Sequence, residues 1–547
     1  MNLFRLFNTV KYLRPVQVYS RVWFRLYRPI PDLRAAPGLR VVAGSWEVPL
    51  EKPESLLSLW RFRFLNEEHE CVFPGDWNRE GLNKLWLYNL HYFDCLSAGG
   101  RREPLVEMVD RWVVDNPPGY GNGWEPYPLS LRIVNWIKWS LAGNVLSGEA
   151  LQSLAIQVRY LRKRLEYHLL GNHLFANGKA LVFAGLFFVG AEADAWLEKG
   201  LSILRHEIPE QVLADGGHFE RSPMYHSIIF EDMLDLINLC RAYGREVPDL
   251  WITVIGKMGR WLQVMSHPDG DIALFNDAAL GIAAKPEKLF DYLERVTGEV
   301  VENDGGRCFA LASSGYYVMA PGSGDRLLVD CGEIGPDYLP GHAHCDTLSF
   351  ELSLAWRRVV VDSGCGIYVD GRERQYNRGN IGHNTVTVDG LNQSEIWGAH
   401  RCARRARPVS AELMDEGGCL EFKGSHDGYR RLSGDLLHNR EIVWSDDLIT
   451  VCDVIEGAGC HTLSGRLHLH PELSVFVKDG QVIVTVADGC KVVIETLSGL
   501  DLQVEKGWYS PEFGKFIECP VVTWSGHDLQ LPFIGGFKLL VKVELFS

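Results

Sequence analysis

Apolar residues recur at spacings of three and four between about residues 56 and 301 of the chain. This spacing predicts amphipathic helices, because residues three and four apart share one face of a helix. Helix breakers such as those at 116–119 and 269–270 separate the segments. The predicted helices span residues 82–95, 104–115, 128–142, 151–169, 174–188, 192–206, 226–243 and 250–265. With no strands expected between them, they indicate an all-α domain whose hairpin-like spacing suits a helical toroid.

The pattern changes near residues 303–306, where short or alternating apolar runs replace the helical spacing. Such runs predict β-strands, and Asp-Gly pairs between them predict tight turns. The predicted strands span residues 315–319, 326–329, 350–354, 359–361, 385–388, 448–453, 465–470, 473–478, 482–486, 491–496 and 537–544. We therefore expect an antiparallel β-sandwich at residues 305–547, after a toroid at 56–304 and a basic segment at 1–55 that packs on the helical domain.

Length and charge narrow the class of protein. A chain of 547 residues is too long for one core. Its net charge of −15 argues against a nucleic-acid binder, so any polyanion must bind where positive charge is local. The 13 cysteines are scattered and odd in number, which suits free thiols in a reducing compartment. Neither a secretory signal nor an apolar stretch long enough to span a membrane is expected, so the prediction is a cytoplasmic protein.

The first forty residues are locally basic, with eight Lys or Arg side chains against the single acid Asp32. Aromatic and aliphatic residues interleave with these charges at helical spacing. Such a segment suits peripheral contact with an anionic membrane, here the inner face of the cytoplasmic membrane. It equally suits a helix docked on the protein's own body, and the sequence leaves both interpretations open.

The stretch 341–384 places His342, His344, Asp346, Asp362 and His383 among short apolar runs. In an alternating strand His342 and His344 would share a face, because side chains repeat with a period of two. Zn²⁺ binds N and O ligands at about 2.0–2.2 Å, so His344, Asp362 and His383 would suffice for a site with one open position. Hydrogen-bonded residues at a sheet edge explain the same spacing, so spacing alone leaves both readings open.

Five motifs follow one another in a fixed order: GNHLFANGKAL, SPMYH, GHAHCDTLSFEL, VVVDSG and GHNTVTVDG. In this order, on a helical half followed by a β half, they resemble the heparinase II/III family of polysaccharide lyases. The resemblance covers nearly the whole chain and extends to members found with bacterial surface-polysaccharide genes. It implies an incomplete (α/α) toroid stacked on an antiparallel β-sandwich, with the substrate cleft between them.

The resemblance also implies a function and its residues. Such lyases cleave a uronic-acid-containing polysaccharide by β-elimination and leave a 4,5-unsaturated uronate. By motif, Asn172 and His173 match the pair that neutralises the substrate carboxylate. Tyr225 and His342 match the catalytic tyrosine and histidine. Which of these two removes the C5 proton depends on whether the uronate is gluco- or ido/gulo-configured.

Two further sets of residues come from the same resemblance. His344, Asp362 and His383 match the family's structural metal site, and two imidazoles among three ligands favour Zn²⁺ over Ca²⁺ or Mn²⁺. Tyr376 and Arg378 precede the GHNTV motif, where the resemblance implies substrate-contacting groups.

Two alternative functions remain open. A uronate C5-epimerase needs the same carboxylate neutralisation and two proton-transfer groups, and a non-catalytic polysaccharide-binding or assembly protein could use the same surface. The expected partner is in each case an anionic, bacterial polysaccharide or its precursor, and not a nucleic acid. The polymer and the oligomeric state are not specified by the sequence.

Overall fold

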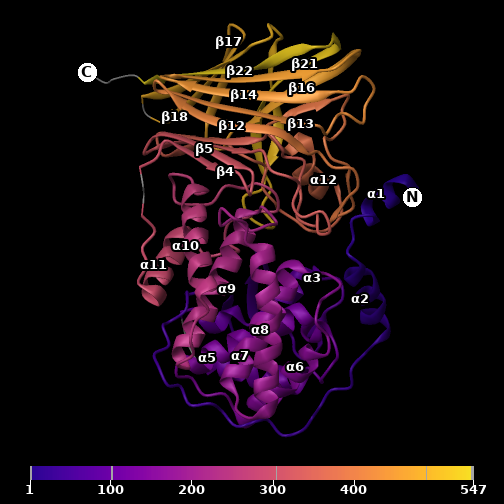
Figure 1. The fold of residues 1–547 in the computed structure, drawn as a ribbon, viewed down its shortest axis with the longest axis vertical. Coiled ribbons are helices and arrows are strands. Elements are labelled where there is room, and N and C mark those ends of the chain that lie inside the picture. The colour runs from indigo at the N-terminus through magenta and orange to yellow at the C-terminus, as the bar shows by residue number, and fades with distance from the viewer. Residues whose placement is uncertain (1–2, 100–102, 303–304, 488, 544–547) are drawn as a thin grey trace.

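The change of pattern near residue 303 divides the chain into two differently built halves in the computed structural model (Figure 1). The structure describes residues 3–99, 103–302, 305–487 and 489–543. Helices dominate the first half, and strands dominate the second. The predicted boundary between 304 and 305 falls at residues that lie outside the described ones, as does residue 544 of the last predicted strand.

The predicted helices are present, most of them with ends within a few residues of the expected positions. The prediction at 151–169 is too long, because the residues after Arg162 form turns that bring Glu166 back toward the next helix. One further helix begins at Pro286 and ends before Gly298, whose φ of 79° stops it. The helices of this half are α3 (Lys84–Tyr92), α4 (Glu103–Asp115), α5 (Pro126–Leu141), α6 (Gly148–Arg162), α7 (Gly171–Phe187), α8 (Ala191–Gln211), α9 (Pro223–Ala242), α10 (Asp249–Val264) and α11 (Pro286–Thr297).

The expectation of an all-α region between residues 56 and 301 is wrong at its beginning. A small antiparallel sheet forms there from β1 (Leu56–Ser58), β2 (Arg61–Phe64) and β3 (Glu67–Glu70). Its strands are three or four residues long, and β2 and β3 are rich in charge, so none of them carries an apolar run long enough to signal a strand. Phe62 is its buried anchor and packs into the core of the helical half.

The second half consists of antiparallel sheets, and every pairing between its named strands in the described ranges is antiparallel. A five-stranded sheet with the order β4-β5-β6-β7-β8 lies next to the helices, and an eight-stranded sheet with the order β12-β13-β14-β15-β22-β19-β18-β17 lies beyond it (Figure 1). A four-stranded sheet has the order β20-β21-β16-β9. Alternation along β14 and β15 between buried and partly exposed positions gives the period-two pattern of a sandwich layer.

The strands of this half have the following bounds: β4 (Cys308–Leu311), β5 (Tyr316–Gly322), β6 (Asp325–Asp330), β7 (Phe350–Leu354), β8 (Arg357–Val360), β9 (Val386–Val388), β10 (Ile396–Trp397), β11 (Arg401–Cys402), β12 (Pro408–Glu416), β13 (Cys419–His426), β14 (Leu437–Ser445), β15 (Leu448–Glu456), β16 (Cys460–His468), β17 (Ser474–Lys478), β18 (Gln481–Ala487), β19 (Cys490–Thr496), β20 (Leu502–Tyr509), β21 (Ile517–Gln530) and β22 (Phe533–Val543). A short helix, α12 (Arg372–Arg378), lies between β8 and β9.

Apolar contacts join the two halves into one body. Each half has its own large buried cluster. A third cluster crosses between them, where Trp261 and Met265 of α10 pack with Tyr316 and Leu328 of the five-stranded sheet. Residues from both halves are therefore held in fixed positions where the helices meet this sheet.

The first 55 residues cover the outside of the helical half. Two short helices, α1 (Leu3–Val10) and α2 (Pro15–Leu26), lie at the right edge of Figure 1. The chain then runs around the helices in extended form, held by backbone hydrogen bonds such as Arg40 N–H to Phe187 O at 2.8 Å and Ala43 N–H to Ala242 O at 3.0 Å. Among the described residues, the structure contains no helix with the length and apolar character needed to cross a membrane.

Candidate active site and metal site

Tyr225 and His342 meet where the helical half faces the β half. Tyr225 lies in the first turn of α9, whose N-cap Ser222 accepts a hydrogen bond from the Tyr225 N–H at 3.3 Å. His342 lies between β6 and β7, and its ring centroid is 4.1 Å from that of Tyr225. The Tyr225 hydroxyl is 3.0 Å from the hydroxyl of Tyr368. A phenol and an imidazole from different halves of the chain are thus in contact.

The strand expected around His342 and His344 is wrong, because residues 341–349 form an irregular loop. The two rings nevertheless share a partner. Asp277 accepts from His342 Nδ1 and His344 Nε2, both at 2.8 Å, and also from the guanidinium of Arg374. Burial alone would raise the pKa of Asp277, but Arg374 and the two histidine hydrogen bonds hold it well below its usual range. Asp277 is therefore a buried anion that orients both rings.

Asn172 and His173 occupy the first turn of α7, where the helix dipole favours a negative ligand. Gly171 starts this helix with a φ of 56°, a conformation that side chains rarely adopt. The Nδ1 of His173 is 3.0 Å from Glu166 Oε1, and its ring lies 4.5 Å from that of Tyr127. Burial would lower the pKa of His173, but the Glu166 carboxylate outweighs burial and raises it.

Glu220 connects these two pairs. Its Oε2 is 3.4 Å from His342 Nε2. Its Oε1 lies 3.0 Å from the position that a Cβ at Gly171 would occupy, next to Asn172. Burial raises the pKa of Glu220, although the His342 ring and the Asn172 backbone amide oppose that shift. The four predicted residues thus form one cluster, and it is open to solvent, since the side chains of His173 and His342 are 31% and 16% exposed.

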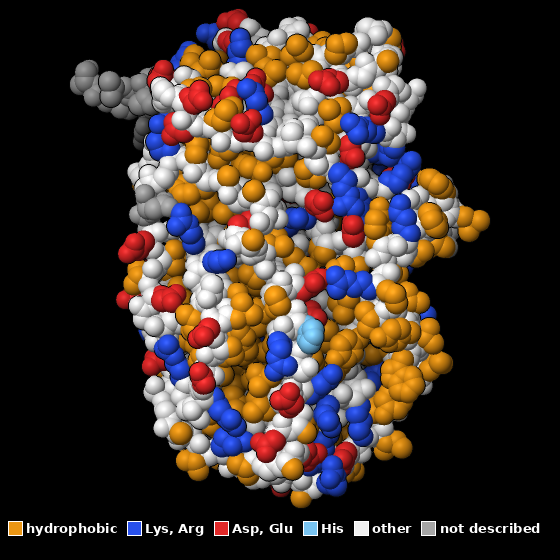
Figure 2. Space-filling model, viewed as in Figure 1, with side chains coloured by type: hydrophobic (Ala, Val, Ile, Leu, Met, Phe, Trp, Pro, Cys, Tyr) orange, Lys and Arg blue, Asp and Glu red, His pale blue; other side chains and the backbone are white. Residues whose placement is uncertain are grey.

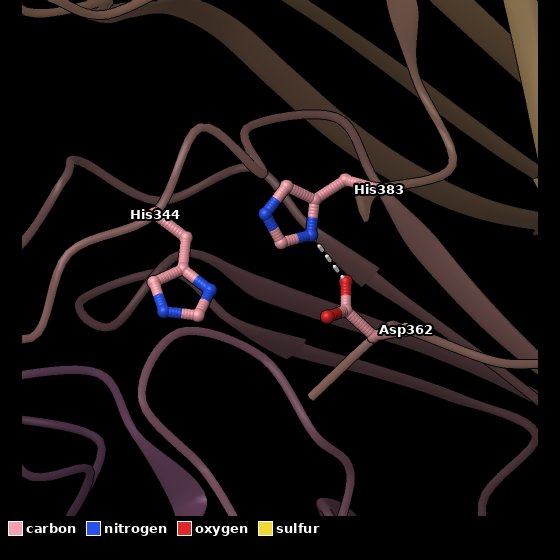
Figure 3. Close-up of side chains that lie close together, drawn as sticks. All are labelled: His344, Asp362 and His383. Carbon is pink, nitrogen blue, oxygen red and sulfur yellow. Dashed lines mark hydrogen bonds and ion pairs between the residues drawn. The ribbon is translucent and has the colours of Figure 1, made fainter. Parts of the chain in front are cut away.

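His344, Asp362 and His383 converge from three separate segments and are fully buried (Figure 3). One potential ligand atom from each lies within 4.8 Å of the others. The Nδ1 of His383 is hydrogen-bonded to Asp362 Oδ2 at 2.8 Å. The Nδ1 of His344 and the Nε2 of His383 have no hydrogen-bond partner among the described residues. Buried polar atoms are rarely left unpaired, so this donor set fits a divalent cation, and its two imidazoles fit Zn²⁺.

Comparison with known proteins places the whole arrangement in one family. A family model described as "Heparinase II/III N-terminus" matches residues 141–294, and one described as "Heparinase II/III-like, C-terminal" matches residues 303–530. The chain belongs to the heparinase II/III family. The resemblance expected from the motifs is thereby confirmed.

The relatives of this heparinase II/III family member differ in name. A heparin-sulfate lyase of Bacteroides stercoris is 26% identical over 64% of this chain, and the match spans only 54% of that protein's length. The FtsZ-localized protein C of Caulobacter vibrioides is 24% identical over 74% of this chain and 72% of its own length. A solved heparan sulfate lyase from Pedobacter heparinus has a TM-score of 0.62 at 19% identity, covering 97% of this chain and 88% of its own. This likeness bears out the predicted fold, a helical toroid followed by an antiparallel β-sandwich.

Two residues expected to contact substrate are placed differently. Arg378 is fully buried at the end of α12, and its guanidinium donates to the backbone carbonyls of Ala343, Gly398 and Arg401. This position contradicts the expected substrate contact, because no part of the side chain reaches the surface. The hydroxyl of Tyr376 is hydrogen-bonded to the Trp508 N–H at 3.0 Å and to the ring of His468. Tyr376 is only partly buried, so its contact with substrate stays a prediction.

Several residues of the cluster were not anticipated from the sequence: Glu166, Glu220, Asp277, Tyr368 and Arg374. Glu220 lies two residues before the SPMYH motif, and Arg374 lies on the helix that carries Tyr376, so proximity to a motif was an available signal for these two. Asp277 follows no recognisable pattern. It lies 65 positions from His342 in the chain and becomes visible only through its contacts.

Proposed function

We propose that this protein is a polysaccharide lyase that breaks a glycosidic bond next to a uronic acid by β-elimination. The observation that carries the proposal is the single cluster of Asn172, His173, Tyr225 and His342. It combines a site for a carboxylate with two proton-transfer groups. β-Elimination that begins with removal of the proton α to a carboxylate requires both. Family membership supports the proposal, and so does the name of the Bacteroides stercoris relative.

Binding of the substrate carboxylate is the first task. The C5 proton of a uronate is weakly acidic because its electron pair must spread onto a group that is already negative. Hydrogen bonds and positive charge at that group lower the barrier. The start of α7 offers the amide of Asn172, the cationic form of His173 that Glu166 favours, and the positive end of a 17-residue helix.

Proton transfer falls to Tyr225 and His342. Burial raises the pKa of Tyr225 well above its ordinary value, although its hydrogen bond with Tyr368 opposes that shift. The free protein therefore holds Tyr225 as a neutral phenol, which can donate a proton to a leaving oxygen and needs positive charge nearby to act as a base. Asp277 fixes the tautomer of His342 by accepting from Nδ1, so the Nε2 of His342 is the atom left to exchange a proton.

His344, Asp362 and His383 are the residues that would hold a divalent cation. When bound, such an ion supplies a structural cross-link between the three segments that carry its ligands. His344 also donates from Nε2 to Asp277, which orients His342. The metal ligands therefore support the position of the catalytic histidine without contacting the substrate.

The proposed substrate is an anionic, uronate-containing polysaccharide of bacterial origin. The binding groups identified are directed at a carboxylate, and the protein's overall charge of −15 makes local recognition necessary. Heparan sulfate belongs in the test panel because of the names of the relatives.

The test is the ultraviolet absorbance of the conjugated, unsaturated product, followed while the purified protein is incubated with a panel of uronate polymers. Tyr225→Phe and His342→Ala should each reduce the rate by about 10²–10⁴-fold, the usual contribution of a general acid or base. A matched control is Tyr429→Phe, which removes a buried tyrosine hydroxyl within the β-sandwich core. The turnover rate of this variant should stay within about a factor of two of the wild-type rate, because the substitution causes only a general loss of stability.

Other outcomes would change the assignment. Inversion at C5 seen by NMR without a rise in absorbance would identify an epimerase. Polymer binding without turnover, unchanged in the Tyr225→Phe protein, would identify a binding or assembly protein and refute the lyase proposal.

A further inference from the structure

The second helix, α2, is mounted with its apolar stripe facing outward. Val18, Tyr19, Val22, Trp23 and Leu26 follow one another at spacings that place them on one helix face, and they are 52%, 62%, 56%, 61% and 79% exposed. An amphipathic helix of a globular protein normally buries such a stripe. The exposed stripe therefore contradicts, for this face, the interpretation that α2 is a helix docked through its apolar side on the protein's own body.

The inward face of α2 is the more polar one. Gln17 is buried and donates from Nε2 to the carbonyl of Tyr338 at 3.1 Å. Phe24 is its main apolar contact and stacks on the ring of His168 at 4.0 Å. The guanidinium of Arg164 lies 3.5 Å from the centroid of the same Phe24 ring. It also donates to backbone carbonyls at the end of the helix. Specific polar contacts thus hold the helix in this orientation.

The first helix adds to the same surface. On α1, Leu3 and Phe7 are 79% and 61% exposed, while Thr9 accepts a hydrogen bond from Trp397 Nε1 at 3.1 Å and ties the helix to the β half. Beyond α2, Ile30 and Leu33 are 84% and 64% exposed. Figure 2 shows apolar side chains gathered along the right edge of the molecule, over α1 and α2, with Lys and Arg side chains beside them.

The charge next to these apolar residues is positive. Eight Lys or Arg side chains and one acidic side chain occur in the first forty residues, within a chain whose net charge is −15. Burial lowers the pKa of Arg21, and the like charges of Arg25 and Arg401 lower it further. Only part of the charge is neutralised internally, by pairs such as Arg34 with Asp32 at 2.7 Å. A ligand of this surface must combine apolar and anionic character.

We propose that the outer face of α1 and α2 is a docking surface for an anionic lipid bilayer. A bilayer surface offers both features at once, since Trp, Tyr and aliphatic side chains insert at the level of the headgroups and Lys or Arg side chains contact anionic lipids. A protein partner could bind this surface only through a groove that is both acidic and apolar. No feature of the described residues points to such a partner. The occupant to which we commit is therefore a membrane rich in phosphatidylserine-type or phosphatidylglycerol-type headgroups.

The docking surface adjoins the candidate active site. Gln17 contacts the carbonyls of Leu169 and Tyr338, and Leu169 lies three residues before Asn172. Docking would accordingly bring the cluster of Asn172 and His173 close to the bilayer, where a membrane-associated polymer is available. This last consequence rests on the proposed function, whereas the membrane contact itself does not.

The experiment measures partition of the full chain into sedimented vesicles of phosphatidylcholine containing about 30% phosphatidylglycerol, with pure phosphatidylcholine as reference. Arg25→Gln/Arg28→Gln should weaken binding about twenty- to thirtyfold, since each cation near an anionic surface contributes about 1 kcal/mol, or about fivefold. Trp23→Ser/Leu26→Ser should weaken it about tenfold or more, because large apolar side chains are removed from the insertion face.

The matched control is Val114→Ser/Val145→Ser, which removes two apolar side chains that are 80% and 82% exposed but lie outside the docking surface. It should bind vesicles like the wild type, and circular dichroism should show that all variants fold. Three results would overturn the proposal: no partition into anionic vesicles, equal partition by the Trp23→Ser/Leu26→Ser protein, or a dimer in sedimentation analysis that this variant alone dissociates. The dimer would assign the face to a second copy of the chain. If the vesicle experiment refutes membrane docking, the absorbance test of the lyase activity is unaffected.

Discussion

The metal site can be tested by measuring the stability of the protein, because His344 and His383 each have one ring nitrogen without a hydrogen-bond partner among the described residues. Without an ion, His344 Nδ1 and His383 Nε2 are buried polar atoms with no partner among the described residues. Each such atom costs about 1–3 kcal/mol of folding free energy. Binding of a divalent cation should therefore relieve about 2–6 kcal/mol. That range corresponds to an ion held at a concentration of about thirty times its Kd or more.

A thermal shift is the expected signature. For domains of 150–250 residues, 1 kcal/mol moves Tm by about 2–4 °C, so saturation should raise Tm by at least about 4 °C. The assay is differential scanning calorimetry of protein treated with a chelator and then supplied with Zn²⁺, Mn²⁺ or Ca²⁺ in separate samples. Equilibrium dialysis should show one ion per chain, with Zn²⁺ bound most tightly because of the two imidazoles.

Two variants separate metal binding from the loss of a buried histidine. His383→Gln removes a ligand and should abolish the metal-dependent shift. His226→Gln is the matched control, because His226 is also fully buried with an unpaired Nδ1 but lies on α9 outside the triad. It should lower Tm and leave the metal-dependent shift intact. The reasoning is refuted if no cation raises Tm, or if the shift in the His383→Gln protein equals that of the wild type.

Two further changes test the start of α7. Glu166→Gln should lower the free energy of unfolding by about 1 kcal/mol at pH 6, because the carboxylate raises the pKa of His173 and pairs with its cation. This stabilisation is complete below the ordinary pKa of histidine and disappears as the pH rises through the raised pKa of His173. Urea unfolding should therefore show a smaller loss of unfolding free energy for Glu166→Gln at pH 9 than at pH 6. Gly171→Ala should reduce polymer turnover more than tenfold, because its Cβ would clash with Leu339 Cδ2, lie 3.0 Å from Glu220 Oε1 and displace these side chains beside Asn172.

Each change has a control of the same kind. Glu192→Gln breaks a pair with Arg159, which stays charged at both pH values, so its effect should not change between pH 6 and pH 9. Gly190→Ala also places an alanine at a positive φ, at the start of α8, where φ is 97° and no atom lies within 4 Å of the added Cβ. It should lower stability and leave turnover unchanged. Equal turnover in the Gly171→Ala and Gly190→Ala proteins would show that the packing of Leu339 and Glu220 against Gly171 has no catalytic importance.

Local patterns determined a large part of this protein. The periods of the apolar residues located the change from helices to strands and most ends of the elements that they predicted, because amphipathic periodicity reflects which face an element buries. The long strands β12, β13, β14, β20 and β21 were not predicted. Residues His344, Asp362 and His383 were also predicted together, since each lies in a motif of the β half. These features depend on neighbours in the sequence, and the sequence therefore contains them in readable form.

Contacts between distant segments were decided only by the tertiary structure. The apolar stripe of α2 predicts an amphipathic helix, but the hydrogen bonds of Gln17 and the packing of Phe24 against other segments determine that the stripe faces outward. Arg378 was expected at a substrate and is instead buried, because the carbonyls of Ala343, Gly398 and Arg401 accept hydrogen bonds from its guanidinium. Asp277 orients His342 from 65 positions away. Such pairings form only when the chain folds and closes long loops, so they cannot be predicted from the spacing of residues.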